Sequence, residues 1–271
     1  MRAWVNGNRT LVTIFQSLFI QTYCPLLFSP KLNMRNMPSV SNCGQPGRRT
    51  FVRFPLLAPF AYQAIVLLCL RHWESAAPWQ DLDFFSGFFF ALAALPPLYK
   101  IRFKRGIFES RETLREASGL SYDPATVRWG SLLAVGELSV FLDYGHWHLM
   151  PALRLPGLQI TGLVVYACAL AALMWTDTCL VRHFQGNPTH RQLMTTGPFA
   201  VVRHPRYASL LLGKLGLSLL FASIFAWVSL LVSIFLIRRR IGLEETHLQE
   251  VFGSRYSSYT EHTHRLFPGI Y

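Results

Sequence analysis

Residues 197–207 read Gly-Pro-Phe-Ala-Val-Val-Arg-His-Pro-Arg-Tyr and open the part of the chain that decides the fold. They lead into an apolar run, residues 207–237, whose only charge is Lys214, and the acidic pair Glu244-Glu245 follows that run. One helix over this run would be about 46 Å long, whereas the hydrocarbon core of a bilayer measures about 30 Å. We therefore predict a helical hairpin that turns near 222–225 and returns both polar blocks to one membrane face.

The composition indicates a membrane protein. Hydrophobic residues make up 51% of the 271 positions and charged residues 15%, and the chain holds 21 Phe and 7 Trp. That is more apolar surface than one soluble core of this size normally needs. The net charge of +12 has an ordinary explanation in cytoplasmic loops beside anionic lipid headgroups, so no nucleic-acid partner is expected.

Four further apolar runs precede the hairpin, at residues 54–70, 84–99, 129–149 and 155–176. A membrane span needs about 20 residues, and flanking positions can complete the shorter runs. The third run carries Glu137 and Asp143, and a carboxylate inside a membrane is usually paired or functional, although Asp143 could simply lie at the outer interface. The runs together predict an all-α, polytopic membrane helical bundle.

The charge pattern predicts the orientation of the spans. Segment 100–128 holds seven Lys or Arg, and segment 181–206 holds four Arg and no acid, whereas segment 73–83 has three acids and no base. Basic short loops stay in the cytoplasm, which places 100–128 and 181–206 inside and 73–83 and 149–157 outside. A hairpin also returns the basic triplet at 238–240 to the cytoplasmic side.

Three regions follow from these patterns. Residues 1–50 are expected to be a poorly ordered N-terminal segment or one extra membrane segment, 51–180 the N-terminal transmembrane spans, and 181–271 a C-terminal cofactor-binding region. After Arg240 the sequence becomes amphipathic, which predicts a surface helix at the cytoplasmic mouth; its apolar positions at helical spacing are Leu248, Val251, Phe252 and Tyr259.

The two polar blocks resemble a known family. The chain is similar to the isoprenylcysteine carboxyl methyltransferase and phospholipid methyltransferase group of integral membrane methyltransferases over roughly 185–270. The matching residues are Arg203, His204, Pro205, Tyr207, Glu244 and Glu245. The chain departs from the family at Ser209, where glycine is usual, and at His264, where relatives often have proline. The resemblance implies a C-terminal helical hairpin and S-adenosylmethionine as the cofactor.

The residues fit the chemistry of that cofactor, which has a sulfonium, an ammonium, a carboxylate and an adenosine. Glu244 and Glu245 offer acceptors for its cationic end, while Arg203 and His204 offer donors and the Tyr207 ring can pack on adenine. We assign catalytic roles to Arg203 and Glu245 and a substrate-binding role to Arg265. The cofactor-binding set is Gly197, His204, Pro205, Tyr207, Glu244 and Glu245.

The acceptor stays open at this stage, beyond being a lipid or another lipophilic molecule reached from the bilayer. A carboxylate acceptor would need no general base, whereas an amine or thiol would need one, and His204 or one of the two glutamates would be nearest. A cytoplasmic opening for the cofactor and a lateral opening for the lipid would place the site where membrane and water meet.

Alternative functions remain. A membrane sterol or enone reductase that uses NADPH has a similar Arg-His-Pro-x-Tyr block, but such enzymes usually differ at Glu244-Glu245. A non-catalytic protein on the same scaffold is the other alternative, which the departures at Ser209 and His264 allow.

The pairs His146/His148 and His262/His264 lack a fixed acidic or Cys partner, and the five cysteines form no CxxC, so no metal is expected.

Overall fold

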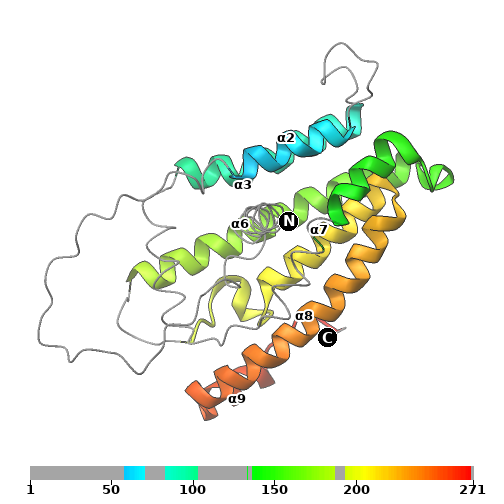
Figure 1. The fold of residues 1–271 in the computed structure, drawn as a ribbon. Coiled ribbons are helices and arrows are strands. Elements are labelled where there is room, and N and C mark those ends of the chain that lie inside the picture. Colours follow the sequence, from blue (N-terminus) through cyan, green and yellow to red (C-terminus); the bar gives the residue numbers. More distant parts are fainter. Residues whose placement is uncertain (1–57, 71–82, 103–132, 134–135, 187–192, 270–271) are drawn as a thin grey trace, which may run out of the picture.

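The computed structural model describes residues 58–70, 83–102, 133, 136–186 and 193–269 (Figure 1), and the predictions for residues 1–50 lie outside these ranges. The described part is helical apart from one isolated β-bridge, which confirms the all-α class. Its first helices are α2 (Ala58–Leu70) and α3 (Phe84–Arg102), at the first two apolar runs. The fourth run lies in α6 (Pro156–Gly186), which is longer than predicted.

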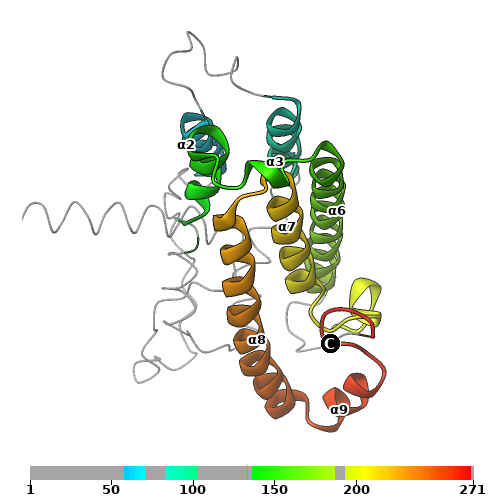
Figure 2. The same ribbon diagram turned by 90° about the vertical axis from the view of Figure 1, so that its right-hand side faces the viewer.

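The predicted hairpin is present as α7 (Pro205–Phe221) and α8 (Ile224–Phe252), which pack side by side (Figure 2). Ala222 and Ser223 make the turn, inside the predicted interval. Ala222 adopts the left-handed conformation with φ of 45°, and Ser223 caps α8 by accepting a hydrogen bond of 3.3 Å from the Phe225 N–H. A two-residue turn without glycine or proline therefore suffices.

The predicted surface helix after Arg240 is wrong in its boundaries. Helix α8 continues through the basic triplet and the acidic pair to Phe252, and its 29 residues span about 43 Å. Gly253, with φ of 54°, then separates it from the short helix α9 (Ser254–Glu261). Leu248 and Tyr259 consequently lie on different helices, because the glycine ends the helical path between them.

Close backbone contact joins α6 to α7. A Cβ atom at Gly216 would lie 2.7 Å from the Tyr166 nitrogen, and one at Gly162 would lie 2.4 Å from the Leu220 nitrogen. Small residues at such crossings are typical of membrane helix pairs, in which van der Waals packing replaces the hydrophobic effect. The two glycines therefore set the distance between α6 and the hairpin.

The hairpin turn is buried rather than exposed at a loop tip. Leu220, Phe221 and Ser223 have no exposed surface, and Ala222 is 2% exposed. The Phe221 ring makes edge-on contacts with Phe89 of α3 and with Phe141 of the helical segment 136–142, each at a centroid distance of 5.2 Å. This aromatic cluster anchors the hairpin far from the acidic pair.

Both carboxylates of the third apolar run are buried. Glu137 forms an ion pair with Lys214 of α7, and its carboxylate lies 3.4 Å from the Ser229 hydroxyl of α8. Glu137 is therefore paired with both helices of the hairpin. Asp143 begins a short π-helix, η4 (Asp143–Trp147), and is fully buried inside the protein, while its depth in a membrane stays a prediction. Its Oδ1 accepts a hydrogen bond of 2.9 Å from the Leu149 N–H.

One helix in the described part of the chain, Pro156–Leu180, is long and apolar enough by length and composition to cross a membrane. Phe84–Pro96 is a shorter apolar helix. The multi-pass arrangement and the region boundaries at 51–180 and 181–271 stay predictions.

Candidate active site

The site forms where the segment before α7 meets the C-terminal tail. These two segments are joined by an isolated parallel β-bridge between Val202 and His264. The Arg203 N–H donates to the His264 carbonyl at 2.7 Å, and the His204 N–H donates to the Arg265 carbonyl at 3.0 Å. His264 thus acts through its backbone, and the bridge brings Arg265 beside Glu245 of the acidic pair of α8.

Glu245 lies between two arginines from different segments. Its Oε1 is 3.1 Å from Arg203 Nε, and its Oε2 is 2.8 Å from an Arg265 terminal nitrogen. Burial by itself would raise the pKa of the Glu245 carboxyl, but the contact with His204 and the charges of the two arginines outweigh it and lower the pKa to about 2. The carboxylate is therefore ionised at neutral pH.

Glu244 is held by α7 and by its own helix. Its Oε1 accepts a hydrogen bond of 2.5 Å from the Tyr207 hydroxyl and one of 3.0 Å from Arg240 Nε. Burial would lower the pKa of Arg240, but the neighbouring Glu244 carboxylate and the Tyr207 hydroxyl raise it above its ordinary value. Arg240 is only 3% exposed, so this guanidinium is a buried part of the site.

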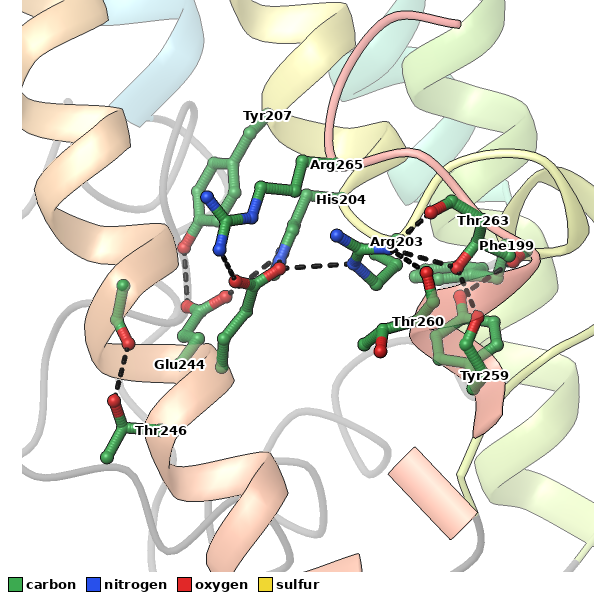
Figure 3. A network of polar contacts seen from close by, with 12 residues as sticks. Phe199, Arg203, His204, Tyr207, Glu244, Thr246, Tyr259, Thr260, Thr263 and Arg265 are labelled. Atoms are coloured by element: carbon green, nitrogen blue, oxygen red, sulfur yellow. Dashed lines mark hydrogen bonds and ion pairs between the residues drawn. The ribbon is translucent and has the colours of Figure 1, made fainter. Parts of the chain in front are cut away.

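The His204 ring lies between the two carboxylates (Figure 3). Its Nδ1 is 3.6 Å from Glu244 Oε2, and its Nε2 is 3.5 Å from Glu245 Oε1. The side chain is 6% exposed, and Nε2 is buried without a hydrogen bond of regular geometry among the described residues. Pro205 begins α7 directly after it, at a position where the missing N–H of proline has no cost, so His204 takes the N-cap position of the helix.

Arg203 also joins the site to the tail. Its guanidinium donates to the Thr260 carbonyl at 3.0 Å and to the Thr263 carbonyl. Beside it, the Tyr259 hydroxyl donates to the Phe199 carbonyl at 2.6 Å. Burial raises the pKa of Tyr259 to about 12, so this phenol is a hydrogen-bond donor throughout the neutral range.

Gly197 opens a short 3-10 helix, η6 (Gly197–Ala200), with φ of 64°. A Cβ at this glycine would lie 3.2 Å from the Cys179 Sγ of α6. The structure thus gives Gly197 a packing role at the edge of the cluster, and its role in cofactor binding stays a prediction. The Ser209 hydroxyl donates to the Pro205 carbonyl at 2.8 Å, so α7 accommodates this departure from the family pattern within its own helix.

Two site residues were missed by the sequence reasoning. Arg240 lies four positions before Glu244, a spacing at which opposite charges on a helix meet, so this pair could have been found. Tyr256 of α9 is 3% exposed, and its hydroxyl is buried without a hydrogen-bond partner among the described residues. Burial and the Glu245 carboxylate raise the pKa of this phenol.

The comparisons with known proteins identify a family over the middle and C-terminal part of the chain. Residues 156–255 match the family model described as phospholipid methyltransferase, a segment that runs from the start of α6 into α9 and covers less than half of the chain. No curated protein and no solved structure matches the chain. The resemblance to membrane methyltransferases is therefore confirmed for this segment, and it indicates methyl-transfer chemistry and association with a membrane.

Proposed function

We propose that the protein is an integral membrane methyltransferase that transfers a methyl group from S-adenosylmethionine to a lipophilic acceptor. The observation that carries the proposal is the position of His204 between two carboxylates, each also held by an arginine. This cluster lies within the segment that matches the phospholipid methyltransferase model, except for Arg265 and the tail residues.

The residues present fit the proposed cofactor. Among the described residues, the buried polar atoms that lack a regular hydrogen-bond partner include two of this cluster, His204 Nε2 and the Tyr256 hydroxyl. Such atoms are costly unless a ligand or water satisfies them. The carboxylates would attract the ammonium and sulfonium charges, and the arginines would attract the carboxylate of the cofactor's methionine part.

The protein's contribution to methyl transfer would be orientation and exclusion of water. S-adenosylmethionine supplies a methyl group already activated by its sulfonium, so no proton transfer is needed to release the leaving group. Arg203 and Glu245 would bind the part of the cofactor that lies beside the bridge between Val202 and His264. The hydrogen bond between Tyr207 and Glu244 would hold α7 against α8, which form one wall of the site. Holding donor and acceptor in line within a dry site can supply much of the rate enhancement.

The location of the cluster supports an acceptor that arrives through the membrane. Glu244 lies about 30 Å along α8 from its first residue, Ile224, which matches the thickness of a hydrocarbon core. Between these points α8 exposes large apolar side chains at Val228, Leu231 and Phe235. We infer that the cofactor enters from the cytoplasmic side and that the acceptor approaches along the lipid-facing helices.

A binding titration tests the proposal. Purified protein in detergent should bind S-adenosylmethionine and should not bind NADPH. Glu245→Gln should weaken the binding of S-adenosylmethionine by roughly tenfold to a hundredfold, because it removes a charged hydrogen-bond acceptor. Glu261→Gln on the exposed side of α9 is the matched control. Binding of NADPH alone would support the reductase alternative, and binding of neither would support a non-catalytic protein.

A further inference from the structure

A second polar pocket lies at the other end of the α7–α8 hairpin. Its volume is about 360 Å³, and it is lined by Leu70, Asp83, Ser86, Tyr144, Gly145, His148, Arg154 and Gln159. The Gln159 amide inside it donates to the carbonyl of Leu220, next to the hairpin turn, at 3.2 Å. The acidic pair lies about 30 Å away along α8, so this pocket is separate from the candidate active site.

The polar groups of the pocket are held in place by its walls. Asp83 accepts hydrogen bonds of 2.7 Å from both the N–H and the hydroxyl of Ser86, and it also accepts one from the Tyr144 hydroxyl. Arg154 donates to the carbonyls of Asp143 and Tyr144, each at 3.0 Å, and its guanidinium lies 4.5 Å above the Tyr144 ring. Tyr144 therefore stands between one fixed carboxylate and one fixed guanidinium.

Arg154 keeps unused capacity to bind. Its Nε is buried and has no hydrogen-bond partner among the described residues, although the residue lines the pocket. Its terminal nitrogens bond to two backbone carbonyls and contact His148 Nδ1 at 2.7 Å, none of which carries a full negative charge. A half-buried guanidinium whose Nε–H lacks a hydrogen-bond partner favours an anion, and phosphate accepts such donors well.

The pocket is suited to a polar ligand at headgroup depth. Its volume lies in the range of small-molecule sites, but most of its lining side chains are polar, which does not suit an acyl chain. Large apolar side chains beside it are exposed, namely Trp147, Leu149, Leu153 and Leu155. Exposed Trp with neighbouring aliphatic residues is typical of the membrane interface, where headgroups lie.

We propose that this pocket binds the zwitterionic headgroup of a phospholipid in the leaflet opposite the candidate active site. The phosphate contacts Arg154 and His148, and the ammonium contacts Asp83, with Tyr144 between the two charges. The pocket is a lipid-binding site distinct from methyl transfer, and the bound lipid ties α3, η4 and the start of α6 together over the buried hairpin turn.

The test uses full-length protein, stripped of lipid in an uncharged detergent, and measures binding of soluble short-chain lipids by calorimetric titration. Dihexanoyl phosphatidylethanolamine carries both charges, and dihexanoyl phosphatidylglycerol carries the phosphate alone. Asp83→Asn keeps the helix cap on α3, since Asn caps as well as Asp, and removes only the charge. It should weaken binding of the ethanolamine lipid about tenfold and leave the glycerol lipid unchanged.

Arg154→Lys keeps the positive charge but loses the planar set of donors, so it should weaken both lipids, and Glu261→Gln should match the wild type. Glu245→Gln should also match the wild type, which separates this site from the proposed methyltransferase site. Equal lipid binding by wild type and Asp83→Asn, or no binding by the wild type, would overturn the proposal. Free phosphoethanolamine binding as tightly as the lipid would overturn the assignment to a membrane lipid.

Discussion

The Tyr207 hydroxyl donates a 2.5 Å hydrogen bond to Glu244 Oε1, and this bond joins the first turn of α7 to α8 across 37 positions of sequence. Tyr207 is 6% exposed and Glu244 9% exposed, so the bond is shielded from water. A buried hydrogen bond to a carboxylate is stronger than one between neutral groups. The bond therefore fixes the Glu244 carboxylate relative to the His204 ring, which precedes the same helix.

Tyr207→Phe tests this bond. The phenylalanine ring fills the same space as the tyrosine ring, so the protein should fold. The Glu244 carboxylate should lose one of its two hydrogen-bond donors and keep the other, Arg240. We expect the dissociation constant for S-adenosylmethionine to rise about tenfold in a binding titration. Tyr259→Phe is the matched control, because it removes a hydrogen bond to the Phe199 carbonyl instead of one to the acidic pair. Equal cofactor affinity in both variants would contradict the role of Tyr207.

Glu245 should make the folding stability of the protein depend on pH in the acidic range. The pKa of its carboxyl is lowered from 4.5 to about 2, so the folded state favours the ionised form more than the unfolded state does. Its contribution is fully present above pH 4.5 and is lost as the pH falls towards 2. The unfolding temperature of the wild type should therefore fall more between pH 6 and pH 3 than that of Glu245→Gln. Parallel pH profiles of the two proteins would argue against this ion-pair network.

The sequence predicted the hairpin well because the length of an apolar run can be counted directly. Residues 207–237 are too long for one membrane span, and a basic triplet follows them. The acidic pair and the Arg-His-Pro-x-Tyr block were also predicted to meet, and they do. Arg265 beside Glu245 depends on the bridge between Val202 and His264, a long-range backbone pairing that no local pattern encodes. The burial of Asp143 likewise depends on η4 folding against other helices.

The contact between Gly216 and α6 should be intolerant of a methyl group. In Gly216→Ala the new Cβ would meet backbone atoms of Tyr166 at 2.7 Å, and backbone cannot rotate away as a side chain can. We expect a loss of about 1–3 kcal/mol in the free energy of unfolding, measured in detergent. Gly242→Ala, at an exposed position of α8, is the matched control, since nothing lies within 4 Å of the new Cβ. This substitution should leave the free energy of unfolding unchanged or raise it slightly.

The orientation of the hairpin can be tested by labelling introduced cysteines in intact cells, in a background without the five native cysteines. A cysteine at Ser118 or at Ser257 should react with an impermeant reagent only after permeabilisation, because both positions are predicted to be cytoplasmic. A cysteine at exposed Ala152, beside the second pocket, should react without it. Free labelling of Ser257 from outside would contradict the proposed topology.

The role of His204 can be separated into positioning and proton transfer. Its ring is 3.6 Å from one carboxylate and 3.5 Å from the other, and Pro205 fixes its backbone at the start of α7. We expect it to hold the cofactor through hydrogen bonds rather than to act as an obligatory base. An asparagine amide could replace a neutral donor in part, but it could not accept and carry a proton.

His204→Asn should therefore raise the apparent cofactor constant more than it lowers the rate at saturation, whereas His204→Ala should damage both. The rate measurement needs a lipophilic acceptor that supports turnover, and the binding titration with S-adenosylmethionine supplies an independent readout. If His204→Asn instead binds the cofactor normally and loses nearly all turnover, His204 acts as a base. That result would in turn point to an amine or thiol acceptor, because a carboxylate acceptor is already ionised at neutral pH and needs no base.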